Sequence, residues 1–444
     1  MRNNIFLWII MFLFTLISCE KSGVEHLFET DPETRVSDTL KFIKNELTSA
    51  EYGWKVGLAT GDKGGYGFYM KFDENDQVSM LSDFSEESAT DMLTSTFRLS
   101  FNFFASLVFD TYNYITLMHD PVPGVAGGSA GTGYKSDIEY SFVRARGDSL
   151  IFAGKKYKHP LIMVKANKQE QEAYLNGGLY DFEKSFKDFY NDNYQFAYLG
   201  EEGQLRYAIE LNYDGKEIQV SQINADSGID TVFSIPYYNT PFSIELIQDL
   251  EWENETIKSF KIGSKDAVDA IFDNQNKTEL KSQLLPLYDI TEVFAYNENF
   301  RKMTWSNIPD VQEQNHVFNE VNDLFAATGR TISEMYFEFT NSTTARVYVA
   351  YATTASSFSA AVTYKYRLEE DKLFIKYDDH NGNWNTRSAQ VAPVNNLFGI
   401  GDKNDEREFR IEWTSSADKS VKVPIGAIRS VDNPTDLLYG ELDR

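Results

Sequence analysis

The chain has 444 residues, of which 42% are hydrophobic and 15% aromatic, enough apolar material for two or three domains. Its formal net charge at pH 7 is −25. This charge argues against nucleic acid and anionic membrane surfaces as partners, because phosphate binding requires clustered Lys and Arg. We interpret the acidity as a means of staying soluble beside a negatively charged cell envelope, in preference to binding a specific cation.

The first residues have the order of a bacterial lipoprotein signal. Arg2 precedes an apolar run at residues 5–17, which is shorter than the roughly 20 residues that a membrane-spanning helix needs. The run leads into the tetrapeptide LISC, which fits the lipobox, and its Cys19 is the only cysteine of the chain. We predict residues 1–18 as a lipoprotein signal peptide and Cys19 as the site of lipid attachment. The alternative is an ordinary signal peptide with a chance cysteine.

Lipidation of Cys19 would leave the mature chain without a thiol, and hence without disulfides, thiolate metal ligands or a cysteine nucleophile. Residues 19–31 are polar and of mixed charge, as expected of a tether. A first module is predicted for residues 32–166. It begins with an amphipathic helix from Pro32, and strands follow. The segment FDENDQV between two of these strands has the residues of a tight hairpin turn.

The same order of elements recurs twice. A second module, residues 167–308, begins with a helix at about 168–192 and includes a strand pair that turns at Asp214-Gly215. Additional helix is predicted for residues 264–285. A third module, residues 309–444, begins with a helix from Pro309 that stops before Gly329.

The predicted fold class is therefore α+β, with antiparallel β-meander modules that are each preceded by an amphipathic helix. The three helices start at about residues 32, 168 and 309. The modules form two or three domains, because the second and third could share one core.

The segment GVAGGSAGTGYKSD, residues 124–137, contains a formal G-x-S-x-G around Ser129 and the outline of a broken phosphate loop. Neither motif has the strand-to-helix setting that its chemistry needs. We predict a Gly/Ser loop between two strands. The five histidines are scattered without the spacing of metal ligands, and we expect no catalytic residue, metal or cofactor.

Two acidic segments, FDENDQV and KYDDHNGNWN, lack the full ligand pattern of a calcium loop, and both are predicted as hairpin turns. Neighbouring carboxylates also occur, but a glycosidase pair must flank one bond from a shared cleft. One residue retains functional interest. Trp384 lies among planar polar groups at a predicted loop tip, a composition that suits sugar binding. The alternative is that Trp384 folds back onto the sheet edge.

Ordered short motifs in the first module carry a family resemblance: SAEYGWK (49–55), GGYGFYMKFD (64–73), LVFDTYN (107–113), HDP (119–121) and IFAGKK (151–156). In this order they resemble the uncharacterised lipoprotein family catalogued as domain of unknown function 4302. The resemblance implies a substrate of signal peptidase II in bacteria with starch-utilisation-type (Sus) uptake systems. It implies no catalytic residues, and Trp54, Phe109 and Tyr112 in these motifs are expected to pack in the core.

We therefore predict a lipoprotein anchored to the outer membrane through its N-terminal lipid, facing the periplasm or the cell surface. It would bind a carbohydrate or another small ligand, or outer-membrane transporter proteins, without catalysis. One alternative is an extracytoplasmic hydrolase of glycans or peptides with carboxylates on separate strands. A second alternative is a structural subunit of a transporter complex.

Overall fold

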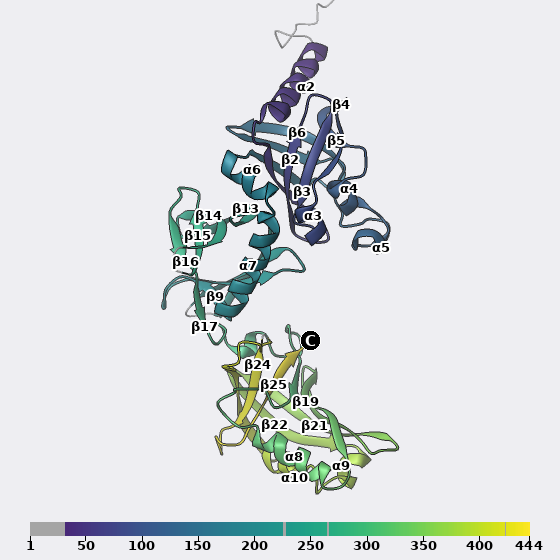
Figure 1. Ribbon diagram of the computed structural model, residues 1–444. Helices are drawn as coiled ribbons and strands as arrows, with labels where there is room; N and C mark the ends of the chain where they lie inside the picture. The colour runs from purple at the N-terminus through teal and green to yellow at the C-terminus, as the bar shows by residue number, and fades with distance from the viewer. Residues whose placement is uncertain (1–31, 225–227, 264–265, 422) are drawn as a thin grey trace, which may run out of the picture.

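The computed structural model describes residues 32–224, 228–263, 266–421 and 423–444. Along the chain these residues form an eight-stranded barrel, a nine-stranded sheet and a second eight-stranded barrel (Figure 1). Neighbouring strands of the barrels and the sheet pair antiparallel. The predicted α+β class with antiparallel β-meander modules is thus confirmed.

The first barrel closes through eight strands that pair in chain order. They are β1 (Trp54–Ala59), β2 (Gly65–Phe72), β3 (Gln77–Ser82), β4 (Leu93–Asn102), β5 (Phe104–Phe109), β6 (Glu139–Arg146), β7 (Ser149–Gly154) and β8 (Pro160–Lys165). Trp54 on β1 pairs with Met70 on β2 and with Lys165 on β8, so both edges of the sheet are joined. Closure protects the edge strands from pairing with other chains.

Apolar side chains fill the interior of this barrel. Val56, Phe68, Leu107 and Phe152 are fully buried and belong to one cluster. Successive side chains of a strand point to opposite faces, so this interior set leaves the alternate residues on the outer wall. The barrel is a packed core, and a ligand site has to be sought on its outer wall.

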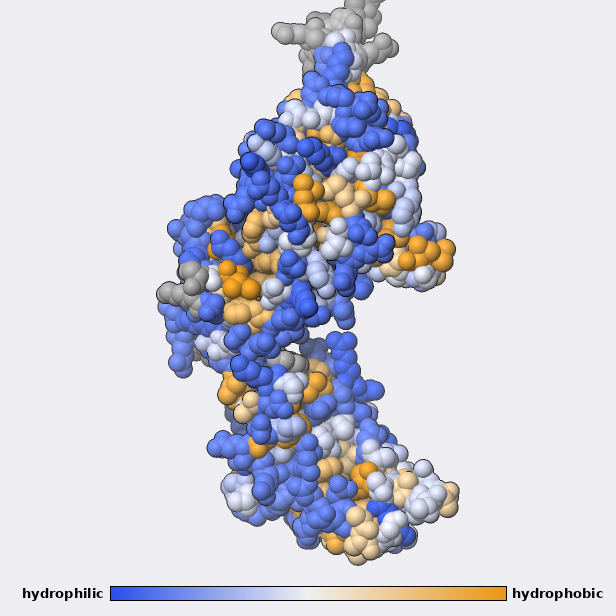
Figure 2. Space-filling model, in the orientation of Figure 1, coloured by the Kyte–Doolittle hydropathy of each residue, from blue (hydrophilic) through white to orange (hydrophobic). Residues whose placement is uncertain are grey.

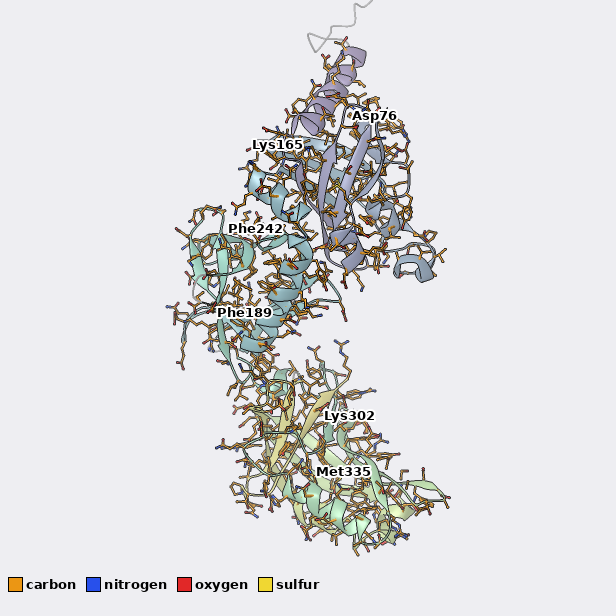
Figure 3. The ribbon with its side chains drawn as sticks, viewed as in Figure 1. Asp76, Lys165, Phe189, Phe242, Lys302 and Met335 are labelled. Carbon is orange, nitrogen blue, oxygen red and sulfur yellow. The ribbon has the colours of Figure 1, made fainter. Side chains whose placement is uncertain are left out.

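Helix α2 (Pro32–Ser49) lies against the end of the barrel where the β2–β3 hairpin turns. Two ion pairs hold it there (Figure 3): Lys44 Nζ lies 2.5 Å from Asp76 Oδ1, and Lys165 Nζ lies 2.7 Å from Glu46 Oε2. The loops at the opposite end carry the short helices α3 (Glu86–Thr90), α4 (Tyr114–His119) and α5 (Pro123–Ala126).

The central sheet follows two helices, α6 (Lys168–Leu175) and α7 (Gly178–Asn193). Its strands are β9 (Phe196–Leu199), β10 (Arg206–Asn212), β11 (Glu217–Asn224), β12 (Gly228–Asn239), β13 (Ile244–Trp252), β14 (Glu255–Ile262), β15 (Val268–Phe272), β16 (Lys277–Glu279) and β17 (Lys281–Gln283). The helix predicted at about 168–192 is divided in the structure into α6 and α7, which are separated at Gly177, and the predicted turn after β10 is confirmed.

This sheet curls around α7. Its two edge strands, β16 and β17, are separated in the chain by Leu280 alone, so the edges must lie close together. Tyr190 on α7 donates to Ile209 O on β10 at 2.9 Å. Tyr194 OH, just after α7, accepts from Val268 N on β15 at 2.7 Å. Strands that are far apart in the sheet therefore contact the same helix.

The second barrel repeats the topology of the first. Its strands are β18 (Lys302–Trp305), β19 (Thr331–Asn341), β20 (Thr344–Ala352), β21 (Ser357–Glu369), β22 (Lys372–His380), β23 (Glu406–Thr414), β24 (Ile425–Ser430) and β25 (Leu437–Asp443). Lys302, labelled in Figure 3, reaches both Glu334 on β19 and Asp443 on β25 and so bridges the closing strands. Its helices are η1 (Ile290–Glu292), α8 (His316–Ala326), α9 (Gly382–Thr386) and α10 (Ala392–Phe398).

Two predicted helices differ in the structure. Residues 264–285 were predicted as helix, but their described part holds β15, β16 and β17. All five residues of β15 are buried, and a short apolar run of this kind has the same pattern in a buried strand and in a helix. The third module's helix, α8, begins at His316 and not at Pro309, and Asp310 has a φ of 52°, which a helix starting at Pro309 would not allow. Strand β18, which lies in the range predicted for the second module, pairs with β19 and β25 and so belongs to the second barrel.

The first barrel and the central sheet meet where β12 crosses β2. A Cβ atom on Gly65 would lie 2.3 Å from Tyr237 O, and one on Gly67 would lie 2.5 Å from Asn239 O. Both distances are shorter than real contacts, so only glycine lets the two backbones approach this closely. The glycines of the motif GGYGFYMKFD are thereby explained by the contact between barrel and sheet.

Asp83 is the polar centre of this junction, and its side chain is completely buried. Its Oδ1 accepts from Gly67 N at 2.7 Å. Its Oδ2 accepts from Asn239 N at 2.8 Å and from Lys216 Nζ at 2.7 Å. A buried carboxylate is tolerated only when it is paired and hydrogen-bonded, and here the partners come from both the barrel and the sheet.

We predict that Lys216→Met destabilises the protein by about 3–5 kcal/mol, because it leaves the Asp83 carboxylate buried without its cation. Urea unfolding followed by tryptophan fluorescence measures the change. Lys258→Met is the control: Lys258 pairs with Asp249 on the exposed surface, and its loss should cost less than about 1 kcal/mol. Equal stabilities for the two variants would contradict the role given to Asp83.

A second prediction concerns Gly57 on β1. A Cβ atom there would lie 2.4 Å from Tyr238 Cε1 of the central sheet. Gly57→Ala should therefore lower the free energy of unfolding by about 1–3 kcal/mol through overpacking, and adding Tyr238→Ala should recover part of the loss. Gly124→Ala is the matched control, because its Cβ atom would meet open space. No recovery in the double variant would show that the loss has another cause.

Candidate functional site

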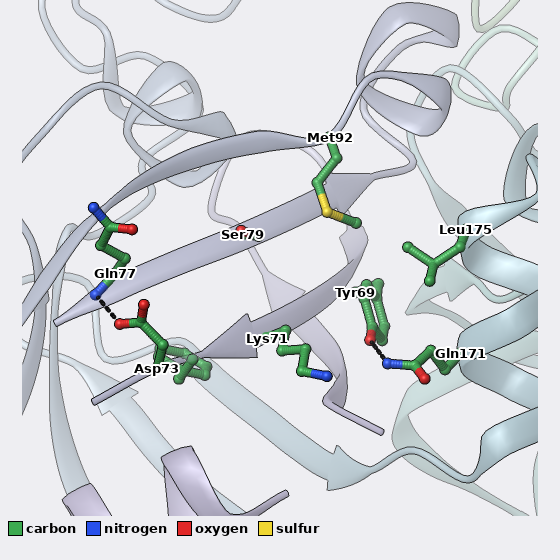
Figure 4. A pocket seen from close by; sticks show the side chains of 9 residues that line it. Tyr69, Lys71, Asp73, Gln77, Ser79, Met92, Gln171 and Leu175 are labelled. Carbon is green, nitrogen blue, oxygen red and sulfur yellow. Dashed lines mark hydrogen bonds between the residues drawn. The ribbon is translucent and has the colours of Figure 1, made fainter. Parts of the chain in front are cut away.

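A groove on the outer wall of the first barrel is the candidate functional site. Its volume is about 340 Å³, within the range of small-molecule sites. Strands β2 and β3 with the turn between them, the residue before β4 and helix α6 contribute to it (Figure 4). Its lining residues are Tyr69, Lys71, Phe72, Asp73, Gln77, Ser79, Met92, Gln171 and Leu175.

The floor of the groove carries one cation and one carboxylate. Strand alternation turns Lys71 outward, and its Nζ donates to Glu51 O at 3.2 Å. Asp73 Oδ1 accepts from Asn75 N and from Gln77 N, each at 2.9 Å, which fixes the carboxylate at the β2–β3 turn. This turn is the FDENDQV segment, and its predicted hairpin geometry is confirmed.

The wall of the groove is fixed by Tyr69. Its hydroxyl donates to Tyr52 O and accepts from Gln171 Nε2 of α6, both at 2.9 Å. Its ring stacks on Tyr174 of α6 with ring centroids 5.1 Å apart. Burial raises the pKa of Tyr69 above the usual value of a phenol. These contacts hold α6 against β2.

Two exposed apolar side chains form the rim. Met92 lies before β4 and Leu175 ends α6, and they approach the groove from different sides (Figure 4). Apolar rim and polar floor together suit an amphipathic ligand, whose hydroxyl or charged groups would meet Lys71 and Asp73.

Two half-buried carboxyl groups with raised pKa values lie away from the groove. Burial raises the pKa of Glu183 on α7 and of Glu245 on β13. Neither residue lines the groove. The described part of the chain contains no group of three or more His, Cys, Asp or Glu side chains that could hold a metal ion.

Trp384 does not lie at a loop tip, and this corrects the sequence interpretation. Its side chain is completely buried in the second barrel, and its Nε1 donates to Asn395 Oδ1 at 2.9 Å. Strand β22 runs to His380, and Asn381 Oδ1 then accepts from Trp384 N as the cap of α9. KYDDHNGNWN is thus a strand-to-helix turn and not a hairpin, and its indole is closed to ligands.

The Gly/Ser segment, residues 124–137, lies between β5 and β6 as predicted; its first three residues belong to α5, and the remainder forms a loop. Tyr134 anchors it: the ring packs 5.9 Å from Tyr66, and the hydroxyl donates to Ala126 O at 2.7 Å. Ser129 leads into a turn and not into a helix, so it lacks the geometry of a nucleophile elbow.

The aromatic residues of the family-like motifs divide into two groups. Trp54 and Phe109 are fully buried, as predicted. Tyr112 is exposed in the turn before α4, so the expectation that it packs in the core was wrong. The predicted lipid-attachment residue Cys19, the signal peptide and the whole predicted tether, residues 19–31, lie outside the described residues.

The groove itself was missed by sequence reasoning. Lys71 and Asp73 belong to a motif that the family resemblance singled out, but its spacing indicated a strand and a turn only. Gln171 and Leu175 come from a helix that is far away in the chain. A groove formed in this way leaves no local signal in the sequence.

Among the helices that the structure describes, none is both long and apolar enough to cross a membrane. The comparison with curated proteins gave no match. One similar solved structure is the isotype 1 transferrin-binding protein B from serogroup B Neisseria meningitidis, at 9% identity over 88% of this chain and 76% of that chain. The TM-score of this likeness is 0.13.

A family model matches more than half of the chain. This model, described as "Domain of unknown function (DUF4302)", covers residues 24–264. The match spans the first barrel and most of the central sheet, and it continues well beyond Ala166, where the recognisable motifs become sparse. The chain therefore belongs to the family of domain of unknown function 4302.

Proposed function

We propose that this protein is a lipid-anchored binding protein of the bacterial envelope. It captures a carbohydrate or similar small amphipathic ligand in the groove on the first barrel, without catalysis. The observation that carries the proposal is the lining of the groove, which sets Lys71 and Asp73 beneath an apolar rim. The groove also lies within the region that matches the family.

The anchor and the setting belong to the same proposal. The lipobox cysteine Cys19 supports attachment to the outer membrane, on its periplasmic or its external face. The family resemblance supports a role in a Sus-type uptake system. In such a system a transporter would receive the ligand from this protein. The alternative function is that of a structural subunit of such a transporter. A structural subunit would bind membrane proteins but no small ligand.

The groove prediction compares two leucine variants. Leu175, 54% exposed, lies on the rim, whereas Leu205, 44% exposed, lies outside the groove. A panel of oligosaccharides and short peptides first identifies a ligand by isothermal titration calorimetry. Leu175→Arg should then lower its affinity at least tenfold, about 1.4 kcal/mol, by blocking the rim. Leu205→Arg should bind like the parent protein.

Two outcomes would contradict this proposal. If no compound of the panel binds, the protein is not a small-ligand receptor of this kind. If both leucine variants bind equally well, the ligand sits elsewhere. Turnover of the bound compound would instead favour the hydrolase alternative.

The lipid prediction is tested in the producing cell. The parent chain should incorporate labelled palmitate and fractionate with outer membranes, because Cys19 receives the acyl chains. Cys19→Ser should lose the label and leave the membrane fraction. Membrane retention of the unlabelled variant would show that attachment does not depend on Cys19.

A further inference from the structure

Five apolar side chains are exposed together beside α2. Three belong to the tip of the β4–β5 hairpin, where Phe101, Phe103 and Phe104 are 49%, 86% and 63% exposed. Phe42 of α2 and Val143 of β6 are also exposed. The ring of Phe42 lies 6.2 Å from the ring of Phe142, the residue before Val143. We call these five residues the aromatic tip. Figure 2 shows hydrophobic surface beside α2 at this end of the barrel.

Phe103 does not stabilise the folded protein, for two reasons. Its φ is 69°, a left-handed conformation that glycine or asparagine adopts readily and that is strained for a bulky residue. Its side chain also gains almost no burial. A strained turn that presents an aromatic ring to solvent contributes nothing to folding, so a functional reason has to be sought.

The aromatic tip lies beside the helix that leads to the proposed anchor. A groove of about 370 Å³ separates the hairpin from the first turns of α2 and is lined there by Arg35, Val36 and Thr39. The chain between Cys19 and Pro32 has twelve residues, which can span at most about 40 Å. A lipid on Cys19 would therefore keep this end of the barrel close to the bilayer at high effective concentration.

We infer that the aromatic tip inserts into the surface of the lipid bilayer and forms a second membrane contact, which fixes the orientation of the first barrel. The inference rests on the proposed lipid anchor. Phenylalanine side chains bury at the boundary between headgroups and acyl chains, and their insertion needs no cluster of cations. This suits a chain whose net charge is −25, for which electrostatic attraction to anionic lipid is weak.

The test uses the lipidated mature protein in phosphatidylcholine vesicles. Because Cys19 is the only cysteine and its thiol carries the lipid, Phe103→Cys supplies a single thiol for an environment-sensitive fluorophore. Vesicle flotation separately measures whether the lipid on Cys19 attaches the protein to the vesicles. Phe358→Cys on β21 of the second barrel, an exposed position, is the matched control.

We expect the label at position 103 to shift to shorter wavelength in vesicles and to be quenched at least twofold more by spin-labelled lipid than the label at position 358. Sodium chloride at 0.5 M should leave both effects unchanged, because the contact is apolar. Phe103→Gly should keep or raise the unfolding temperature by relieving the strained turn. In that background, a label introduced by Phe101→Cys should lose most of its quenching.

Several results would overturn the inference. If the protein floats with the vesicles while the label at position 103 stays in water, the anchor stands but the aromatic tip does not insert. If the protein does not float, the anchor fails and the inference fails with it. A blue shift that depends on protein concentration and not on lipid would assign the tip to a contact between two copies of the chain.

Discussion

The buried carboxylate of Asp83 is the interaction on which the arrangement of the first barrel and the central sheet depends. It accepts from Gly67 of the barrel and from Lys216 and Asn239 of the sheet, so each part completes the hydrogen bonding of the other. Helix α6 lies in the chain between these two parts and forms one wall of the groove. A barrel separated from the sheet would therefore lose the junction and the support of the groove together.

The region that matches the family contains both sides of this junction. It includes the glycines of β2 and the strand β12 that crosses them, and it ends after β14, before the second barrel. The first barrel and the sheet depend on each other here, because neither can bury its side of Asp83 alone. The second barrel has its own core and closes its own strands, so it is an addition to this unit.

Local signals in the sequence predicted the elements that local chemistry determines. Asp73 predicted its hairpin, because its side chain caps the turn that it occupies. The predictions failed where distant contacts decide: β15 is buried on both faces, and Trp384 packs in the core of the second barrel, where Asn395 on another helix accepts its indole N–H. The groove and Asp83 could not be predicted for the same reason, since their partners are far apart in the chain.

The position of α2 connects the proposed anchor with the groove. The C-terminal end of α2 leads to Glu51, whose carbonyl accepts a hydrogen bond from Lys71 of the groove floor. Its N-terminal end, at the top of Figure 1, is the described part of the chain that is nearest in sequence to Cys19. The second barrel lies at the opposite end of the molecule (Figure 1). A second membrane contact beside α2 would thus hold the groove at a fixed height above the lipid and direct the second barrel away from it. One lipid alone would leave that orientation free, because a single attachment point permits rotation.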